Sequence, residues 1–84
     1  MNKKQHRTFQ RIFEKPVRSD IRWNDVESLF SALGAEISEG RGSRVRIAFK
    51  GVRAVLHRPH PERVTSKGTV KSIRRILQEA GVKP

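Results

Sequence analysis

The side chains that can do chemistry in this sequence are basic groups that alternate with apolar residues in two neighbouring runs. They are Arg44, Arg46, Arg53 and His57. Histidine exchanges protons near neutral pH, whereas guanidinium groups stay protonated and bind phosphate oxygens. Such a set can deprotonate a ribose 2′-hydroxyl for attack on the adjacent phosphate and stabilise the charge that develops, with no metal ion. We therefore predict a catalytic pair of His57 as acid–base group and Arg44 as charge stabiliser.

A plainer role for His57 is equally open. A single histidine has weak specificity as a signal, and a histidine on a sheet can simply contact a phosphate. Arg44 cannot take over as a base, because guanidinium does not lose its proton in proteins. The sequence therefore predicts phosphate binding at this surface more firmly than it predicts cleavage.

A β-hairpin of residues 44–49 and 52–57 is needed to bring these groups together. Lys50 and Gly51 can form its two-residue turn, although a longer loop with the same pairing is the alternative. One face then pairs apolar residues, Phe49 with Val52, Ile47 with Ala54, and Val45 with Leu56. The other pairs Ala48 with Arg53, Arg46 with Val55, and Arg44 with His57. A slip of one residue would bury arginines and expose isoleucine and phenylalanine, which costs too much to compete.

Further basic residues extend this surface. The predicted RNA-binding residues are Arg41, Arg46, Arg53, Arg58, His60, Lys67 and Lys71, of which Arg41, Arg58 and His60 are placed at the rim of the sheet. A charged run is often only a solvated face. Here the arginines of the two strands have no acidic neighbours in the predicted pairing, so their mutual repulsion favours a polyanionic ligand.

The charge balance agrees with that ligand. The 84 residues hold 19 Lys and Arg against 8 Asp and Glu, a formal net charge of +11. Most of the excess lies in residues 40–84, whereas residues 20–39 are acidic. Nucleic acid is the favoured partner, and an anionic membrane is the weaker alternative, because no segment joins a broad apolar face to a lysine-rich one.

Composition also limits the cofactors and the compartment. Without cysteine there is no disulfide, thiolate nucleophile or cysteine metal site, and His6, His57 and His60 lack metal-ligand spacing, so no metal or other cofactor is expected. The polar, basic N-terminus does not resemble a signal peptide, and no apolar run could span a bilayer. We expect a cytoplasmic protein.

The remaining elements must cover the apolar side of the hairpin. Residues 1–19 are predicted to be a basic extension with a short helix near residues 8–15, and residues 20–84 a single domain. Within it, Asn24 and Glu27 predict a capping box for a helix over residues 25–33, with Trp23 just outside. A strand at residues 35–39 follows, and Ser66 or Thr69 caps a last helix that ends at Gly81. The predicted class is α+β in the order α-β-β-β-α, with both helices on one face of a three-stranded antiparallel sheet.

These features together resemble the HicA family of toxins over residues 21–82. The matching motifs are Leu33-Gly34, Gly42-Ser43, Pro59-His60 and the run from Lys67 to Ile73 that opens the last helix. The resemblance implies a fold like the double-stranded RNA-binding domain and an mRNA interferase, a metal-independent endoribonuclease. It also implies a HicB-type antitoxin partner. An acidic surface on that partner would complement the basic face.

One position departs from the family. Its catalytic histidine follows the glycine-serine pair, where this sequence has Arg44. Two hypotheses result. Either His57, opposite Arg44 in the hairpin, has taken over the acid–base role, or the chain is a non-catalytic RNA-binding module.

Overall fold

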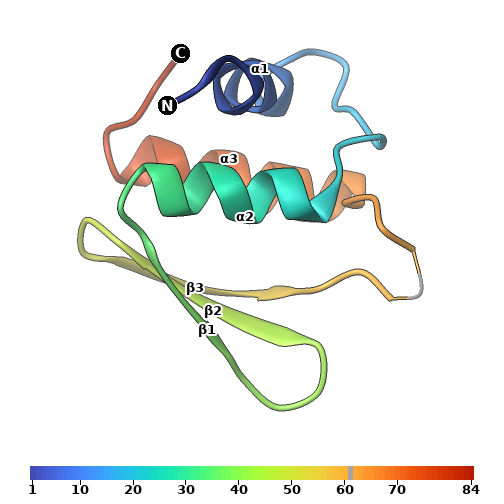
Figure 1. Cartoon of the computed structure of the whole chain (residues 1–84), viewed down its shortest axis with the longest axis vertical. Coiled ribbons are helices and arrows are strands. Elements are labelled where there is room, and N and C mark those ends of the chain that lie inside the picture. Colours follow the sequence, from blue (N-terminus) through green and yellow to red (C-terminus); the bar gives the residue numbers. More distant parts are fainter. Residues whose placement is uncertain (61) are drawn as a thin grey trace.

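Three helices and one sheet make up the computed structural model, which describes residues 1–60 and 62–84 (Figure 1). The elements, in chain order, are α1 (Lys3–Ile12), α2 (Trp23–Ala32), β1 (Glu36–Glu39), β2 (Arg44–Phe49), β3 (Val52–His57) and α3 (Lys67–Glu79). The strands form an antiparallel sheet in the order β1-β2-β3. The predicted α+β class and element order are therefore confirmed.

The hairpin has the predicted register. Arg44 pairs with His57 and Phe49 with Val52, so Lys50 and Gly51 alone form the turn. Both have positive φ, 48° and 80°. Positive φ at both positions characterises the type I′ turn, whose twist matches that of the strands it joins. The alternative of a longer loop is excluded.

Helices α2 and α3 pack on one side of the sheet, and α1 lies across these helices on the side away from it (Figure 1). The core between the layers contains fifteen buried apolar residues contributed by all three helices, β2, β3 and Ile21. Alternate residues of β2 point into it, because strand side chains alternate between the two faces. The other face of the sheet is left uncovered by helices.

The start of α2 differs from the prediction. Trp23 is the first helical residue and is only 4 % exposed, and Arg22 precedes it without a side-chain cap. The backbone N–H of Trp23 donates to the carbonyl oxygen of Arg63 at 2.9 Å, and Arg22 pairs with Val64. These tertiary contacts set the beginning of the helix, so the predicted capping box of Asn24 and Glu27 is wrong.

Helix α1 is longer toward the N-terminus than expected. Asn2 caps it by accepting from the N–H of Gln5, whose side chain accepts in return from the N–H of Asn2. At the other end, the guanidinium of Arg74 donates to the carbonyl oxygens of Ile12 and Glu14 at 2.8–3.0 Å. The helix thus ends at Ile12, where a side chain of α3 satisfies carbonyls that the last turn leaves free.

Within residues 1–60 and 62–84, no helix has the length and apolar character that crossing a bilayer requires.

Candidate nucleic-acid interface

The uncovered face of the sheet, called the open face below, displays the predicted basic residues. Arg44, Arg46, Arg53 and His57 are all exposed, while their neighbours in sequence Val45, Ile47 and Leu56 are buried. The apolar residues are buried under α2 and α3. Because alternate side chains of a strand point to opposite faces of the sheet, the basic residues between them must point to the open face. The core thus positions the site.

Three rows of side chains cross the open face. The first joins Arg44 with His57, the second joins Ser38, Arg46 and Val55, and the third joins Glu36, Ala48 and Arg53. Side chains directly opposite on neighbouring strands lie within contact range of each other. Arg44 and His57 can therefore reach the same small region of a molecule bound on this face.

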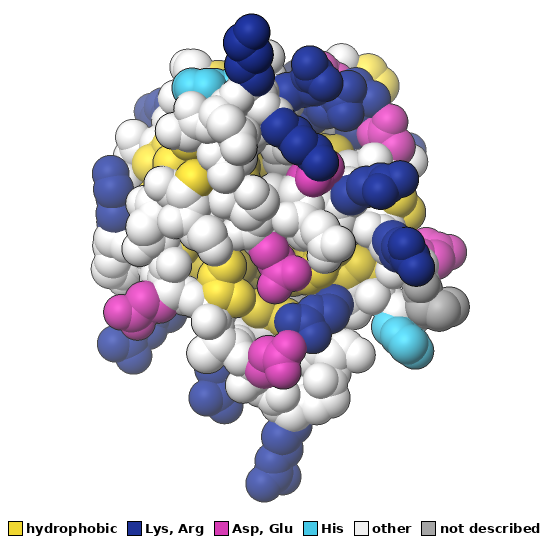
Figure 2. Space-filling model, in the orientation of Figure 1, with side chains coloured by type: hydrophobic (Ala, Val, Ile, Leu, Met, Phe, Trp, Pro, Cys, Tyr) yellow, Lys and Arg dark blue, Asp and Glu magenta, His cyan; other side chains and the backbone are white. Residues whose placement is uncertain are grey.

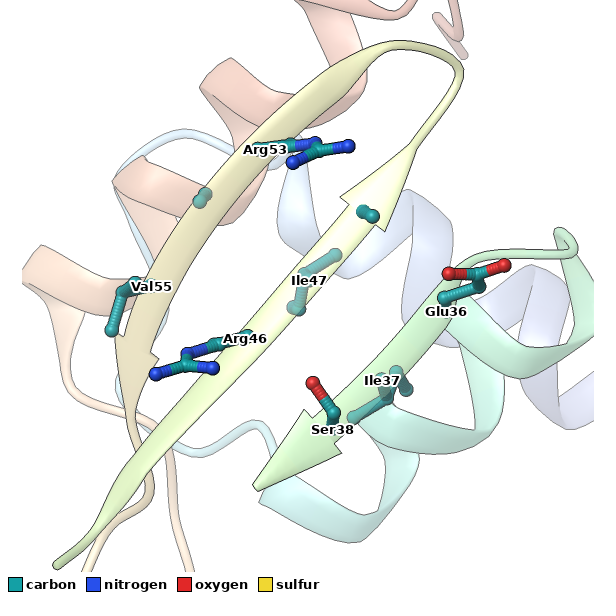
Figure 3. A pocket seen from close by; sticks show the side chains of 9 residues that line it. Glu36, Ile37, Ser38, Arg46, Ile47, Arg53 and Val55 are labelled. Carbon is teal, nitrogen blue, oxygen red and sulfur yellow. The ribbon is translucent and has the colours of Figure 1, made fainter. Parts of the chain in front are cut away.

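A shallow groove of about 670 Å³ runs over the last two rows. Figure 3 shows Arg46 beside Val55 and Arg53 extending from β3 toward β2, with Glu36 and Ser38 on β1. Val55, on the edge strand β3, is 55 % exposed and gives the groove an apolar floor between the arginines. A base or ribose could cover it while the flanking guanidinium groups bind phosphate.

The charge of the open face is largely uncompensated. In the described part of the chain, Arg44, Arg46 and Arg53 form no ion pair. Arg58 differs, since it contacts Glu39 at 2.8 Å and Glu27 at 3.7 Å. Its N–H donates to the carbonyl oxygen of Ser43, which holds the residue at the end of the hairpin beside these acids. Arg58 is therefore less available to a ligand than the three strand arginines.

His57 also lines a second groove, of about 350 Å³, beyond the end of β3. This groove is bounded by His60, Glu62 and the first turn of α3, where the hydroxyl of Ser66 accepts from the N–H of Thr69 at 3.3 Å. His57 is thus shared between the open face and a groove that contains another histidine. Two proton-exchanging groups beside one groove can serve as a base and an acid.

The other predicted residues take different positions. Arg41 is exposed in the turn between β1 and β2, and its carbonyl oxygen accepts from the N–H of Arg44 at 3.3 Å. Lys67 and Lys71 are exposed on α3, which packs on the covered side of the sheet. The structure does not bring Lys71 onto the open face with the arginines.

Two residues of the groove were missed from the sequence. Glu36 and Ser38 belong to β1 and share the open face with Ala48 and Arg46. The sequence does contain a signal for them. Residues 40–43 form a short turn, so the residues of β1 that face those of β2 can be found by counting in both directions from that turn. Glu36 adds an acid to a face on which the predicted pairing of residues 44–49 with 52–57 placed none.

Comparison with protein families identifies a relationship for most of the chain. A family model described as HicA toxin of bacterial toxin-antitoxin matches residues 23–82. The matched segment begins with the first residue of α2 and includes the whole sheet and α3, so α1 lies outside it. No curated protein and no solved structure matches the chain significantly.

Proposed function

The chain belongs to the HicA family of bacterial toxin-antitoxin toxins, and from this premise we propose that it binds and cleaves mRNA on the open face of its sheet. The exposed, unpaired arginines of β2 and β3 support the binding of the RNA backbone. An mRNA substrate would also place the protein's action in the cytoplasm.

In the proposed reaction, His57 removes the proton of a ribose 2′-hydroxyl. The 2′-oxygen attacks the adjacent phosphorus, and the bond from phosphorus to the 5′-oxygen of the next nucleotide breaks. Arg44, directly opposite His57, stabilises the charge on the phosphate oxygens. His60, in the same groove as His57, gives a proton to the leaving 5′-oxygen. The products are a 2′,3′-cyclic phosphate and a 5′-hydroxyl.

The observation that carries this proposal is the pairing of Arg44 with His57 on an exposed, cationic surface. The test is His57→Ala in the full chain, incubated with RNA. Cleavage should fall by about 100- to 10,000-fold, the usual contribution of a general acid–base group, while RNA affinity changes little. His6→Ala is the matched control, because His6 lies on α1 outside both grooves. Undiminished cleavage by the His57 variant would exclude the assignment.

A specific observation favours a second candidate function. Arg44 stands where the family resemblance places a catalytic histidine. A non-catalytic RNA-binding module would keep the cationic open face and lose the chemistry. Pure wild-type protein that binds RNA but leaves it intact after long incubation would establish this second function in place of the first.

Membership of the family also implies an antitoxin partner. We propose a HicB-type protein with an acidic surface that covers the open face, since three unpaired arginines there would gain partners on binding. Charge reversal by Arg46→Glu with Arg53→Glu should abolish the complex. A complex that forms unchanged would place the antitoxin on another surface.

A further inference from the structure

Helix α1 carries a row of bases that the fold does not explain. Lys3, Arg7 and Arg11 follow one another at intervals of four residues, so they lie along one side of the helix. The opposite side, with Thr8, Phe9 and Ile12, is buried. Lys3 and Arg7 are exposed and Arg11 is half-buried. We call these three residues the α1 ridge.

The ridge works against the stability of its own helix. Like charges four residues apart on a helix repel each other. Lys3 and Lys4 also lie at the positive end of the helix dipole, and the first turn contains no acid to offset them. A charge pattern that opposes the local structure points to a role outside folding.

Neighbouring acids neutralise the ridge only in part: Asp20 attracts Arg11 electrostatically, but no acid among the described residues binds a ridge residue directly. Within residues 1–60 and 62–84, Lys3, Arg7 and Arg11 form no ion pair. The nearby acids bind other bases. Asp25 contacts Lys4 at 3.4 Å, and both carboxylates that follow α1, Glu14 and Asp20, bind Arg18 at 2.7 Å.

We infer that the α1 ridge is a second binding surface for the phosphate backbone of RNA, independent of the open face. The inference rests on the proposed function only in naming RNA as the polyanion. The layer of α2 and α3 separates α1 from the sheet in a molecule 32 Å long (Figure 1). Figure 2 shows Lys and Arg side chains over the α1 end at the top and others projecting from the sheet end at the bottom. The two surfaces must therefore bind different segments of RNA.

A polynucleotide suits the ridge better than a membrane does. Helices that lie on membranes insert a broad apolar face beneath their basic residues. In α1 that face is already used, because Phe9 and Ile12 are buried against the rest of the protein. What remains outward is a line of cations, and a chain of phosphates matches it in charge and in shape.

The test is the triple variant Lys3→Gln, Arg7→Gln, Arg11→Gln of the full chain. Its affinity for a fluorescein-labelled oligouridylate long enough to contact both surfaces is measured by anisotropy over a range of salt concentrations. The slope of log K against log salt is negative. Loss of three phosphate contacts should reduce its magnitude by about 2, at about 0.7 per contact for a single strand. The affinity at low salt should fall at least about tenfold, and the melting temperature should stay equal or rise, because repulsion within α1 is relieved.

Two controls separate the ridge from other effects. Lys4→Gln and Arg7→Gln each remove one charge from α1, but only Lys4 is already paired with an acid, so Arg7→Gln should weaken binding more. Arg46→Gln with Arg53→Gln on the open face should combine additively with the ridge variant, since distant sites act independently. The ridge variant is judged by RNA affinity and salt slope, whereas His57→Ala is judged by cleavage, which keeps the two tests distinct.

Two results would overturn the inference. In the first, RNA affinity and its salt slope are the same in the triple variant as in wild type. In the second, the triple variant loses binding to vesicles of anionic phospholipid while RNA binding is unchanged, which would assign the ridge to a membrane surface.

Discussion

Arg44 and His57 lie directly opposite each other across β2 and β3, with both side chains on the open face. The carbonyl oxygen of Arg44 accepts from the N–H of Gly40, so its backbone is turned toward β1 and away from β3. The pair is therefore of the type that exchanges no backbone hydrogen bonds, in which facing side chains approach most closely. A guanidinium and an imidazole held this way can act on one phosphodiester.

This arrangement predicts that the two side chains can be exchanged. The double variant Arg44→His, His57→Arg moves the imidazole to the other strand of the same row. We expect it to cleave RNA much faster than His57→Ala does, because the imidazole stays on the open face with a guanidinium directly opposite. The measurement is the initial rate of RNA cleavage by both variants. Activity no higher than that of His57→Ala would show that catalysis needs the imidazole on β3.

The open face should bind phosphate through individual arginines. Arg46→Gln and Arg53→Gln should each reduce the salt slope of RNA binding by about 0.7. Neither should change the free energy of unfolding by more than about 0.5 kcal/mol, since both side chains are exposed and unpaired. Salt titrations and urea unfolding measure the two quantities. Arg58→Gln is the comparison: its ion pairs with Glu39 and Glu27 predict a smaller loss of affinity.

The turn between β2 and β3 predicts opposite effects at its two positions. Gly51 has a φ of 80°, and a Cβ added there would meet no atom within 4 Å. Gly51→Ala should thus destabilise by about 1 kcal/mol through backbone conformation alone. Lys50→Asn should stabilise by a few tenths of a kcal/mol, because asparagine tolerates positive φ better than lysine. Urea unfolding measures both. A stabilising Gly51→Ala would contradict the type I′ turn.

Acid stability should depend on the contact of Arg18 with Asp20. Arg18 donates two hydrogen bonds to the carboxylate, at 2.8 and 2.7 Å, and thereby lowers the pKa of Asp20 below its ordinary value of 3.8. A depressed pKa stabilises the fold above the ordinary value and loses that contribution as pH falls through the lowered one. Asp20→Asn should therefore flatten the stability profile below about pH 4. Arg18→Gln should do the same, and an unchanged profile in both would contradict the assignment.

The sheet could be predicted from the sequence more closely than the helix boundaries. Strict alternation in β2 and β3 and the Lys50-Gly51 turn allow one register, because a slip moves every arginine into the core. The start of α2 could not be predicted this way. It depends on the contact of Trp23 with Arg63, 40 positions away, which no local pattern records. Asn24 and Glu27 have the right spacing for a capping box. The contact of Trp23 with Arg63 nevertheless starts the helix one residue before Asn24, so neither residue caps it.

The site divides similarly. Residues of β2 and β3 were placed on the open face by alternation alone, whereas those in loops depend on tertiary contacts. Arg58 binds acids from β1 and α2, and His60 lies in the groove beside α3. Neither position follows from the order of residues, because a loop of irregular conformation has no period from which to count.

The guanidinium of Arg74 has a consequence for the order of assembly. It holds carbonyl oxygens of Ile12 and Glu14, roughly sixty positions earlier in the chain. During synthesis the first helix leaves the ribosome long before Arg74 is added to the chain. Helix α1 can pack on α2 before then, but its C-terminal end gains these hydrogen bonds only after the last helix emerges.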